Sequence, residues 1–539
     1  MEKKKLIIIS CIPIILTCLI IILFGPRYHI VDDLLINYIL EGVYGKGMNQ
    51  YIILPYLSVV FTFPIYLIEL ILPNMNIYLV SLYFYMTVAF IGLNILFYKK
   101  YQQIWLQCLL WILQLILLQY LTYTVVAYMI CFVGLLYLFD NTSRIFKIIG
   151  LCCIGFGISI RKDIFLSLLI LCFPLIVYSF IKNKKITIIH FVLCFCIYFG
   201  ICGIDSYIAS KNFKVQSYLQ WNDICTQVRD FPMISYEDYD EEFIKNDISY
   251  NDFECIYSWI FVEKQSLGEE QLQILSQQRS FFQKYEINPI QIAITFFSEP
   301  MYIMYSLFAI IILMMYKWKN YLGLGIVFCT MGDLAALILR QRVVERVYIP
   351  LMICGVLLLL YEKKDTFKNR RLQFDTVIQI SSFLWLTSML IYGLNFKNWF
   401  VFHQDKPMSQ TYQYAQSHSE DLLIFDGYRQ LIKAQYPIDL FMYDDSQFNK
   451  NLMTLGNWDT FSIRYYEQMK NFDIDQPDYF LEHVHEYDHV KFIMYPDSPK
   501  KSLIQKWYLE HKNVNIQFHV IDYIGKMEVM EVKVKSYDE

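Results

Sequence analysis

Residues 51–72 read YIILPYLSVVFTFPIYLIELIL, and their interpretation decides how the rest of the chain is placed. The segment is apolar and long enough for a membrane-spanning helix, which needs about 20 residues. It nevertheless contains Pro55, Pro64 and Glu69, and Pro73 follows it. Because proline removes a backbone donor and clashes with the preceding turn, a straight buried helix is not expected. We therefore expect 51–72 to form a kinked hairpin or an interfacial helix that does not cross the membrane.

The composition around this segment is that of an integral membrane protein. Of the 539 residues, 56% are hydrophobic and 18% are charged, against about 45–50% and about 25% in soluble domains. The chain has 44 Tyr and 41 Phe, which suits a protein with much interfacial and lipid-facing surface. The net charge is −4 and no segment is strongly basic, so we expect no binding of nucleic acid.

Twelve apolar runs are candidates for spanning helices. They are 6–24, 51–72, 76–98, 104–121, 123–139, 148–160, 164–181, 186–204, 295–316, 320–338, 347–361 and 373–395. If all twelve crossed, five basic clusters would lie on the opposite side from the N-terminal lysines. If 51–72 does not cross, all of these clusters move to the cytoplasm, as the positive-inside rule requires. The sequence thus predicts an α-helical polytopic protein of the cell membrane, with about 11 transmembrane helices and a cytoplasmic N-terminus.

The same topology divides the chain into domains. Residues 1–396 form the predicted transmembrane domain, with a first outer loop at 25–75 and a large outer loop at 205–290. We expect the large loop to lie over the membrane domain as a lid. In 397–539 the apolar stretches shrink to strand length, which predicts a small extracytoplasmic α/β domain with a mixed sheet. Its expected elements are strands at 421–425, 438–443 and 491–495, a helix at 502–511 and a hairpin at 515–534.

Two adjacent carboxylates, Asp32 and Asp33, follow the first predicted helix in the sequence RYHIVDDLLINY at 27–38. Ionised carboxylates are costly at a membrane surface, where they are partly desolvated. A structural use is a helix N-cap by Asp32, with Asp33 interacting favourably with the helix dipole. A functional use is a general base on an acceptor hydroxyl, or a ligand for a divalent cation. Both uses are compatible, because consecutive helical residues point about 100° apart.

Basic residues also lie on the predicted outer side, where positive charge is normally sparse. They are Arg161, Lys162, Arg340, Arg342 and Arg346, with Asp163 and Glu345 beside them in the sequence. The planar fork of donors on arginine suits phosphate. The alternatives are contacts with anionic lipid head groups and ion pairs with the neighbouring carboxylates.

Three further features have weaker functional interpretations. Asp333 lies within an apolar run, and an ion pair with Arg340, seven residues on, is the simpler account of it. His485 to His489 matches the zinc-binding pattern His-Glu-x-x-His, but a strand is expected directly after it, so we assign no metal site there. Cys225 and Cys255 lie in the large outer loop as a disulfide or as two free thiols.

Together, these features resemble the GT-C superfamily of membrane glycosyltransferases, which use polyprenyl-phosphate-linked sugars. Members carry an acidic residue in the first outer loop, here Asp32 and Asp33, and in many of them a helix along the membrane follows, here at 52–73. The outer arginines are similar in position to residues that engage the lipid phosphate. The chain lacks a His-Pro-Pro-Leu-like stretch, having Leu54-Pro55-Tyr56-Leu57, and lacks a WWDYG-like motif. These departures argue against protein N-glycosylation and leave the acceptor open.

The resemblance implies a transfer of sugar from a polyprenyl-phosphate donor to an extracytoplasmic glycan or cell-envelope polymer. In that interpretation an outer-loop aspartate is the base of an inverting reaction, and Arg161, Arg340, Arg342 and Arg346 bind the donor phosphate. Lys162, Asp163, Asp333 and Glu345 would support the site. The alternatives are a polysaccharide polymerase or ligase, a transporter or flippase of lipid-linked sugars, and a non-catalytic receptor.

Overall fold

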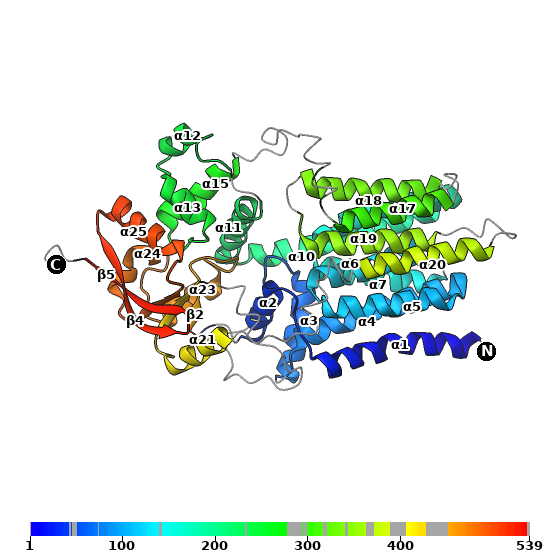
Figure 1. Ribbon diagram of the computed structural model, residues 1–539, viewed down its shortest axis with the longest axis horizontal. Helices are drawn as coiled ribbons and strands as arrows, with labels where there is room; N and C mark the ends of the chain where they lie inside the picture. Colours follow the sequence, from blue (N-terminus) through cyan, green and yellow to red (C-terminus); the bar gives the residue numbers. More distant parts are fainter. Residues whose placement is uncertain are drawn as a thin grey trace.

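The computed structural model describes residues 2–42, 45, 51–73, 75–139, 143–231, 234–277, 294, 298, 300–315, 321–339, 343–362, 371–388, 406–426 and 451–535. These residues form two parts, a bundle of long helices and a smaller part that contains a sheet (Figure 1). The N-terminus lies at the end of the bundle that is remote from the sheet, and the C-terminus lies beyond the sheet.

The bundle is built from apolar helices that run side by side (Figure 1). They are α1 (Glu2–Phe24), α4 (Ile77–Tyr101), α5 (Ile104–Gln119), α6 (Tyr123–Phe139), α7 (Arg144–Ile160), α8 (Lys162–Leu171), α9 (Phe173–Lys182), α10 (Lys184–Ser210), α17 (Pro300–Met315), α18 (Tyr321–Leu339), α19 (Glu345–Tyr361) and α20 (Arg371–Ser388). Every residue of α6 is buried, whereas α10 buries only Thr187, Cys194 and Ile201. Many other apolar side chains of α10 are exposed, among them Val192 and Phe199, as expected of a helix that faces lipid.

Four of the described helices are long and apolar enough to cross a membrane: α1 from Lys4 to Phe24, α4, α10 and α18. The pair α8 and α9 makes a fifth candidate if it is one span bent by 62°. The expectation of several apolar helices is confirmed, but the expected number of about 11 spans is not reached by these criteria. The 17 residues of α6, for example, extend only about 26 Å, against a hydrocarbon core of about 30 Å. Apolar residues outside the helices, such as Tyr120 and Leu121, had lengthened the runs in the sequence.

The first outer loop contains two short helices, α2 (Val31–Glu41) and α3 (Val59–Ile71), at the end of the bundle nearest the sheet (Figure 1). Only 13 residues of the segment 51–72 are helical, and Pro64 lies among them. At about 20 Å, α3 is too short to cross a bilayer. Asp205 of α10 anchors its start by accepting hydrogen bonds from the Ser58 hydroxyl (2.8 Å) and the Val59 amide (3.0 Å).

The sheet has five strands in the order β2-β1-β3-β5-β4. They are β1 (Leu422–Phe425), β2 (Leu452–Met453), β3 (Val490–Met494), β4 (Ile516–Ile524) and β5 (Met527–Val534). Strand β1 is parallel to β2 and β3, and β5 is antiparallel to β3 and β4, so the predicted mixed sheet is confirmed. Gly525, with φ of 61°, turns the predicted hairpin, and the predicted helix at 502–511 is α25 (Pro499–Lys512). The expected strand at 438–443 lies outside the described residues.

The large outer loop is not a lid over the membrane domain. Its helices α11 (Phe213–Arg229), α12 (Asp240–Lys245), α13 (Tyr250–Tyr257), α14 (Lys264–Leu267) and α15 (Glu269–Gln277) share one hydrophobic core with the sheet. In this core Trp221 and Phe253 belong to the loop, and Phe492 and Trp507 to the C-terminal region. The sequence did not reveal which part of the chain the apolar residues of this loop would meet. Its cysteines, Cys225 and Cys255, are buried free thiols.

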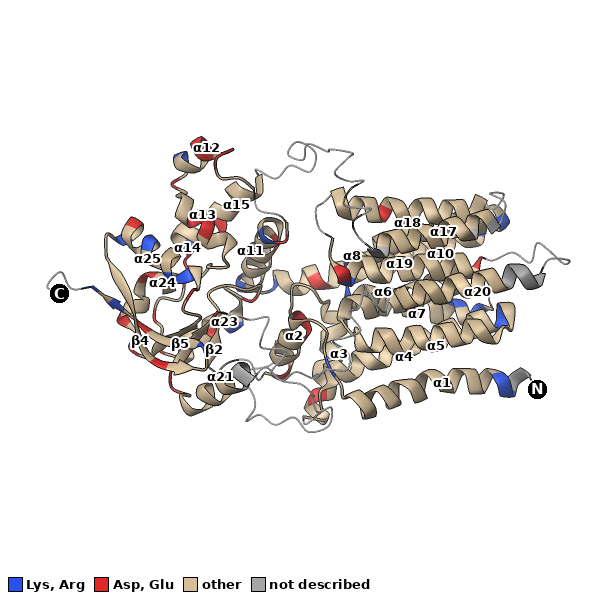
Figure 2. Cartoon of the chain, in the orientation of Figure 1, with Lys and Arg blue, Asp and Glu red and all other residues tan. Residues whose placement is uncertain are grey.

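Charged residues are unevenly distributed between the two parts. Figure 2 shows lysine and arginine gathered at the end of the bundle that is remote from the sheet, and many acidic residues in the sheet-containing part. The apolar helices of the bundle are compatible with insertion into a membrane. The two parts touch where the Tyr56 and Trp458 rings meet edge to face, with 5.6 Å between their centroids.

Candidate functional site

The two aspartates lie in the first turn of α2, at the end of the bundle that faces the sheet. The N-cap of α2 is Ile30, and no side chain caps this helix. The prediction that Asp32 is the N-cap is therefore wrong. Both carboxylates project from the helix toward other elements, where each finds a different kind of partner.

Asp33 is fully buried between helices. Its Oδ1 accepts hydrogen bonds from the Tyr78 hydroxyl of α4 (2.7 Å) and from the backbone amide of Tyr123 at the start of α6 (3.0 Å). Burial raises the pKa of this carboxyl group to about 7, although both hydrogen bonds oppose the shift. Asp33 thus joins α2 to α4 and α6, and water has no access to it.

Asp32 is about one-fifth exposed and forms an ion pair with Arg346 in the first turn of α19, through Oδ2 and Nη1. The arginine side chain is exposed to a similar extent. The two residues are 314 positions apart in the sequence. The fold therefore brings together one predicted carboxylate and one predicted phosphate-binding arginine, and both keep a solvent-accessible edge.

Arg161 lies between α7 and α8 and completes this group. Its Nη1 donates to the Tyr123 hydroxyl (3.0 Å) and to Thr124 Oγ1 (2.8 Å), and the guanidinium lies 5.4 Å from the centre of the Tyr123 ring. Tyr123 interacts electrostatically with Arg161, Arg346, Asp32 and Asp33. We call Asp32, Asp33, Tyr123, Arg161 and Arg346 the bundle-end cluster.

The other predicted site residues have more peripheral positions. Lys162 pairs with Asp205 (2.5 Å), the residue that anchors α3. Asp163 and Glu345 are exposed in the first turns of α8 and α19, and the Glu345 carboxylate accepts a hydrogen bond from Tyr120 (3.4 Å). Asp333 lies inside α18, and among the described residues no hydrogen bond or ion pair joins it to the cluster. Arg340 and Arg342 lie outside the described residues.

Several residues around the cluster were not singled out in the sequence. The neutral donors and acceptors of the cluster are Tyr78, Tyr123 and Thr124. In a sequence with 44 tyrosines, nothing distinguishes Tyr78 and Tyr123 from the others. His29 packs against Tyr120 with 3.8 Å between ring centres. Burial, and secondarily Arg27, lowers the pKa of His29 to about 4, so this ring is neutral at physiological pH.

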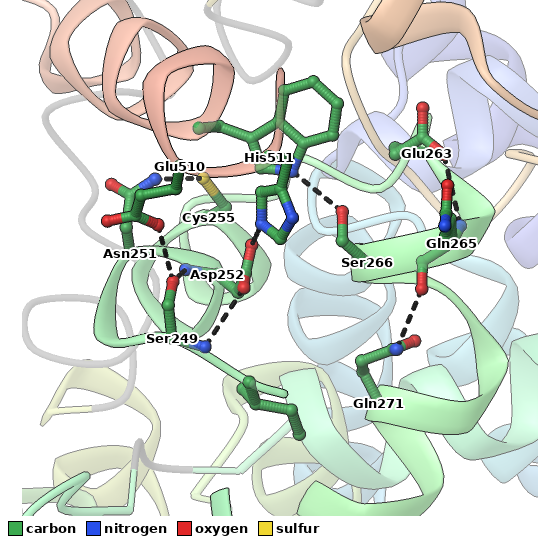
Figure 3. A network of polar contacts seen from close by, with 12 residues as sticks. Ser249, Asn251, Asp252, Cys255, Glu263, Gln265, Ser266, Gln271, Glu510 and His511 are labelled. Carbon is green, nitrogen blue, oxygen red and sulfur yellow. Dashed lines mark hydrogen bonds and ion pairs between the residues drawn. The ribbon is translucent and has the colours of Figure 1, made fainter. Parts of the chain in front are cut away.

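A second polar group joins the large outer loop to the sheet region (Figure 3). One ligand atom each from Asp252, Glu510 and His511 lies within 4.8 Å of the others, and among the described residues this is the group that could hold a metal ion. Asp252 and Ser249 form a capping box at the start of α13, and His511 Nε2 lies 2.8 Å from the Asp252 carboxylate. These contacts hold α13 against α25, so we assign them a structural role.

The His-Glu-x-x-His match does not form a metal-binding helix. Helix α24 (Phe480–His483) ends before the pattern, and a 3-10 turn occupies Val484–Glu486. His485 Nδ1 lies 3.2 Å from the Tyr508 hydroxyl, and His489 Nε2 lies 2.6 Å from the Phe472 carbonyl oxygen. Each ring is therefore engaged in a separate structural contact.

No family model matches the chain, and neither a curated protein nor a solved structure matches it. The chemistry of the bundle-end cluster has to be argued from its own geometry. A partly exposed carboxylate, two guanidinium groups and the neighbouring hydroxyl groups suit an anionic ligand that also presents a hydroxyl proton.

Proposed function

We propose that this chain is a membrane glycosyltransferase that transfers a sugar from a polyprenyl-phosphate donor to an extracytoplasmic glycan or cell-envelope polymer. The observation that carries the proposal is the Asp32–Arg346 ion pair. It joins a carboxylate that can accept a proton to a guanidinium that can bind a phosphate. Its position, at the end of an apolar bundle and next to a polar domain, suits a substrate with a lipid tail and a polar head.

The two aspartates have separate roles in this proposal. Asp32 is the catalytic base, because its side chain is partly exposed. Asp33 is a positioning residue, because it is buried and its Oδ1 is held by α4 and α6. By fixing the start of α2, Asp33 fixes the direction in which Asp32 points.

The reaction is an inverting displacement. The acceptor oxygen attacks the anomeric carbon, the bond from that carbon to the phosphate oxygen breaks, and the acceptor proton passes to Asp32. The polyprenyl phosphate leaves as an anion, and Arg346 and Arg161 stabilise its charge. Arg340 and Arg342 are proposed to assist at the same phosphate.

Donor binding changes the state of the base. Before the donor arrives, Arg346 pairs with Asp32 and occupies one of its carboxylate oxygens. A donor phosphate that takes over part of the guanidinium releases Asp32 toward the acceptor. A divalent cation at Asp32 and Asp33 remains an alternative aid to phosphate binding, and it would have to displace Arg346.

The proposal is tested with the full chain reconstituted in liposomes, supplied with polyprenyl-phosphate sugars and a cell-envelope acceptor fraction. We expect release of free polyprenyl phosphate together with labelled acceptor, and no transfer when a nucleotide sugar replaces the lipid donor. Products enlarged by whole oligosaccharide units would instead identify a polymerase or ligase. Movement of the lipid donor across the bilayer without sugar transfer would identify a flippase and contradict the proposal.

A further inference from the structure

Asp333 is a buried carboxylate that the proposed reaction does not use. It lies in α18, six residues or about 9 Å before the end of this span at Leu339. Asp333 is 8% exposed, and its Oδ2 has no hydrogen-bond partner. Among the described residues, Asp333 forms no ion pair either. The earlier explanation, an ion pair with Arg340, involves a residue outside the described part of the chain.

The helix break between α8 and α9 lies next to α18. These two helices are bent by 62° at a break around Cys172, and Pro174 follows two residues later. A side chain at Gly325 of α18 would come within 3.1 Å of Pro174, so the two segments are in close contact. Asp333 interacts electrostatically with Cys172 at the break itself.

Among the described residues, the groups that interact electrostatically with Asp333 are neutral. They are Cys172 at the break, Cys329 on α18 and Tyr128 on α6. The Tyr128 hydroxyl is within 3.4 Å of Ser167 Oγ on α8, which makes this region polar without making it charged. No cationic side chain among the described residues forms an ion pair with the Asp333 carboxyl group, which is 8% exposed.

These observations define what can bind there. A charged carboxylate inside a bilayer is costly unless a cation compensates it. Metal cations need several oxygen ligands, whereas the surroundings of Asp333 offer one carboxylate and a few hydroxyl and thiol groups. A proton needs only the carboxylate. Breaks in spanning helices are also places where membrane proteins bind coupling ions, because the local backbone is free of regular pairing.

We propose that Asp333 is an intramembrane proton-binding site, at which its carboxyl group gains and loses a proton beside the break between α8 and α9. This site is separate from the bundle-end cluster and does not depend on the glycosyltransferase proposal. Helix α8 nevertheless runs from Lys162, next to Arg161, to this break, so the two sites share one structural element.

The experiment uses a hydrophobic carbodiimide on the full chain in liposomes. The O–H of a protonated carboxyl group adds across one C=N bond of dicyclohexylcarbodiimide, and rearrangement gives a stable N-acylurea that mass spectrometry locates. We expect modification of Asp333 that falls at least about tenfold between about pH 6 and about pH 9. A water-soluble carbodiimide should leave Asp333 unmodified.

Two variants make the result decisive. Asp333→Asn should remove the modification at this position. Phe328→Glu places a carboxyl group on the outer surface of the same helix, where Phe328 is 80% exposed, and shows that the reagent reaches α18. The inference is overturned if Phe328→Glu is modified while Asp333 stays unmodified at every pH, or if modification of Asp333 is independent of pH.

Discussion

Asp33 and Asp252 occupy the same position in two different helices, since each is the third residue of its helix and each is buried. Asp252 turns back on its own helix: its carboxylate accepts from the Ser249 amide, and the Ser249 hydroxyl accepts from its amide. Asp33 leaves its helix uncapped and accepts instead from Tyr78 and Tyr123 on two other helices.

The neighbours of these two residues account for the difference in role. Asp252 has the His511 ring of α25 as its partner, and the contact fastens α13 to α25. At Asp33 the nearby cation, Arg346, does not complete a buried joint. It pairs with the neighbouring residue Asp32 and stays partly exposed. The position of a carboxylate in a helix therefore does not define its role. The elements that supply its partners do.

Apart from that of Asp32, the largest expected effect concerns Arg346. Arg346→Gln should lower kcat/KM for the lipid donor by about 10²–10³-fold, because it removes a donor to the leaving phosphate. Arg346→Lys should retain part of the activity, since a point charge remains but the fork is lost. Lys162→Gln is the matched control, because Lys162 pairs with a structural carboxylate. Equal losses in all three variants would count against a specific phosphate contact.

The next effect concerns the stability of the sheet-containing part. Asp252→Leu should destabilise it by about 3 kcal/mol, because it breaks the pair with His511 and the capping box together. The measurement is urea unfolding of the full chain, in which proteolytic cleavage between residues 213 and 277 reports the unfolding of this segment. Unchanged protection of this segment would show that the joint with α25 contributes little.

The pH dependence of this joint has a defined sign. Burial lowers the pKa of His511, but the hydrogen bond and charge of Asp252 outweigh it, so the pKa is raised. The stabilisation is fully present below about pH 6.5, the unfolded value. It is lost as pH rises through the folded pKa. His511→Gln should remove this loss, and a slope of the opposite sign in the unfolding free energy would refute the assignment.

Asp33 should produce a pH effect in a lower window. Its pKa rises from 3.8 when unfolded to about 7 in the fold, where burial favours the protonated form. The folded state therefore holds the extra proton between these values, and stability falls as pH increases across them. Asp33→Asn keeps an acceptor for Tyr78 and should flatten this slope. Thermal unfolding at several pH values measures it, with Asp32→Asn as the control that should keep the slope.

The smallest expected effect is that of the Lys162–Asp205 pair. Lys162→Met should cost less than about 1 kcal/mol, because the lysine is about one-third exposed. Asp205→Ala should cost more, because it also removes the acceptor for Ser58 and Val59. The same unfolding measurement compares them, and a larger cost for the lysine variant would contradict the anchoring role given to Asp205.

The sequence was informative where local chemistry decides the structure. Alternating residues around Gly525 predicted the hairpin, and the charge pattern predicted that Asp32 and Arg346 lie on one side of the bundle. It could not reveal the partners of buried groups. Tyr123 acts through its backbone amide and hydroxyl together, and the large outer loop packs on a sheet about 200 residues further on. Such long-range contacts depend on the assembled fold.

The central claim is that Asp32 is the catalytic base and Asp33 a positioning residue. Sugar transfer by two matched variants tests it most directly. Asp32→Asn and Asp33→Asn are assayed side by side at about pH 7.5 with saturating lipid donor and equal amounts of folded protein. The account predicts that Asp32→Asn loses about 10²–10⁴-fold in kcat, as expected for removal of a general base. Asp33→Asn should stay within about tenfold of the unsubstituted chain, because its acceptor oxygen is retained. Full activity of Asp32→Asn, or a larger loss in Asp33→Asn, would contradict the account.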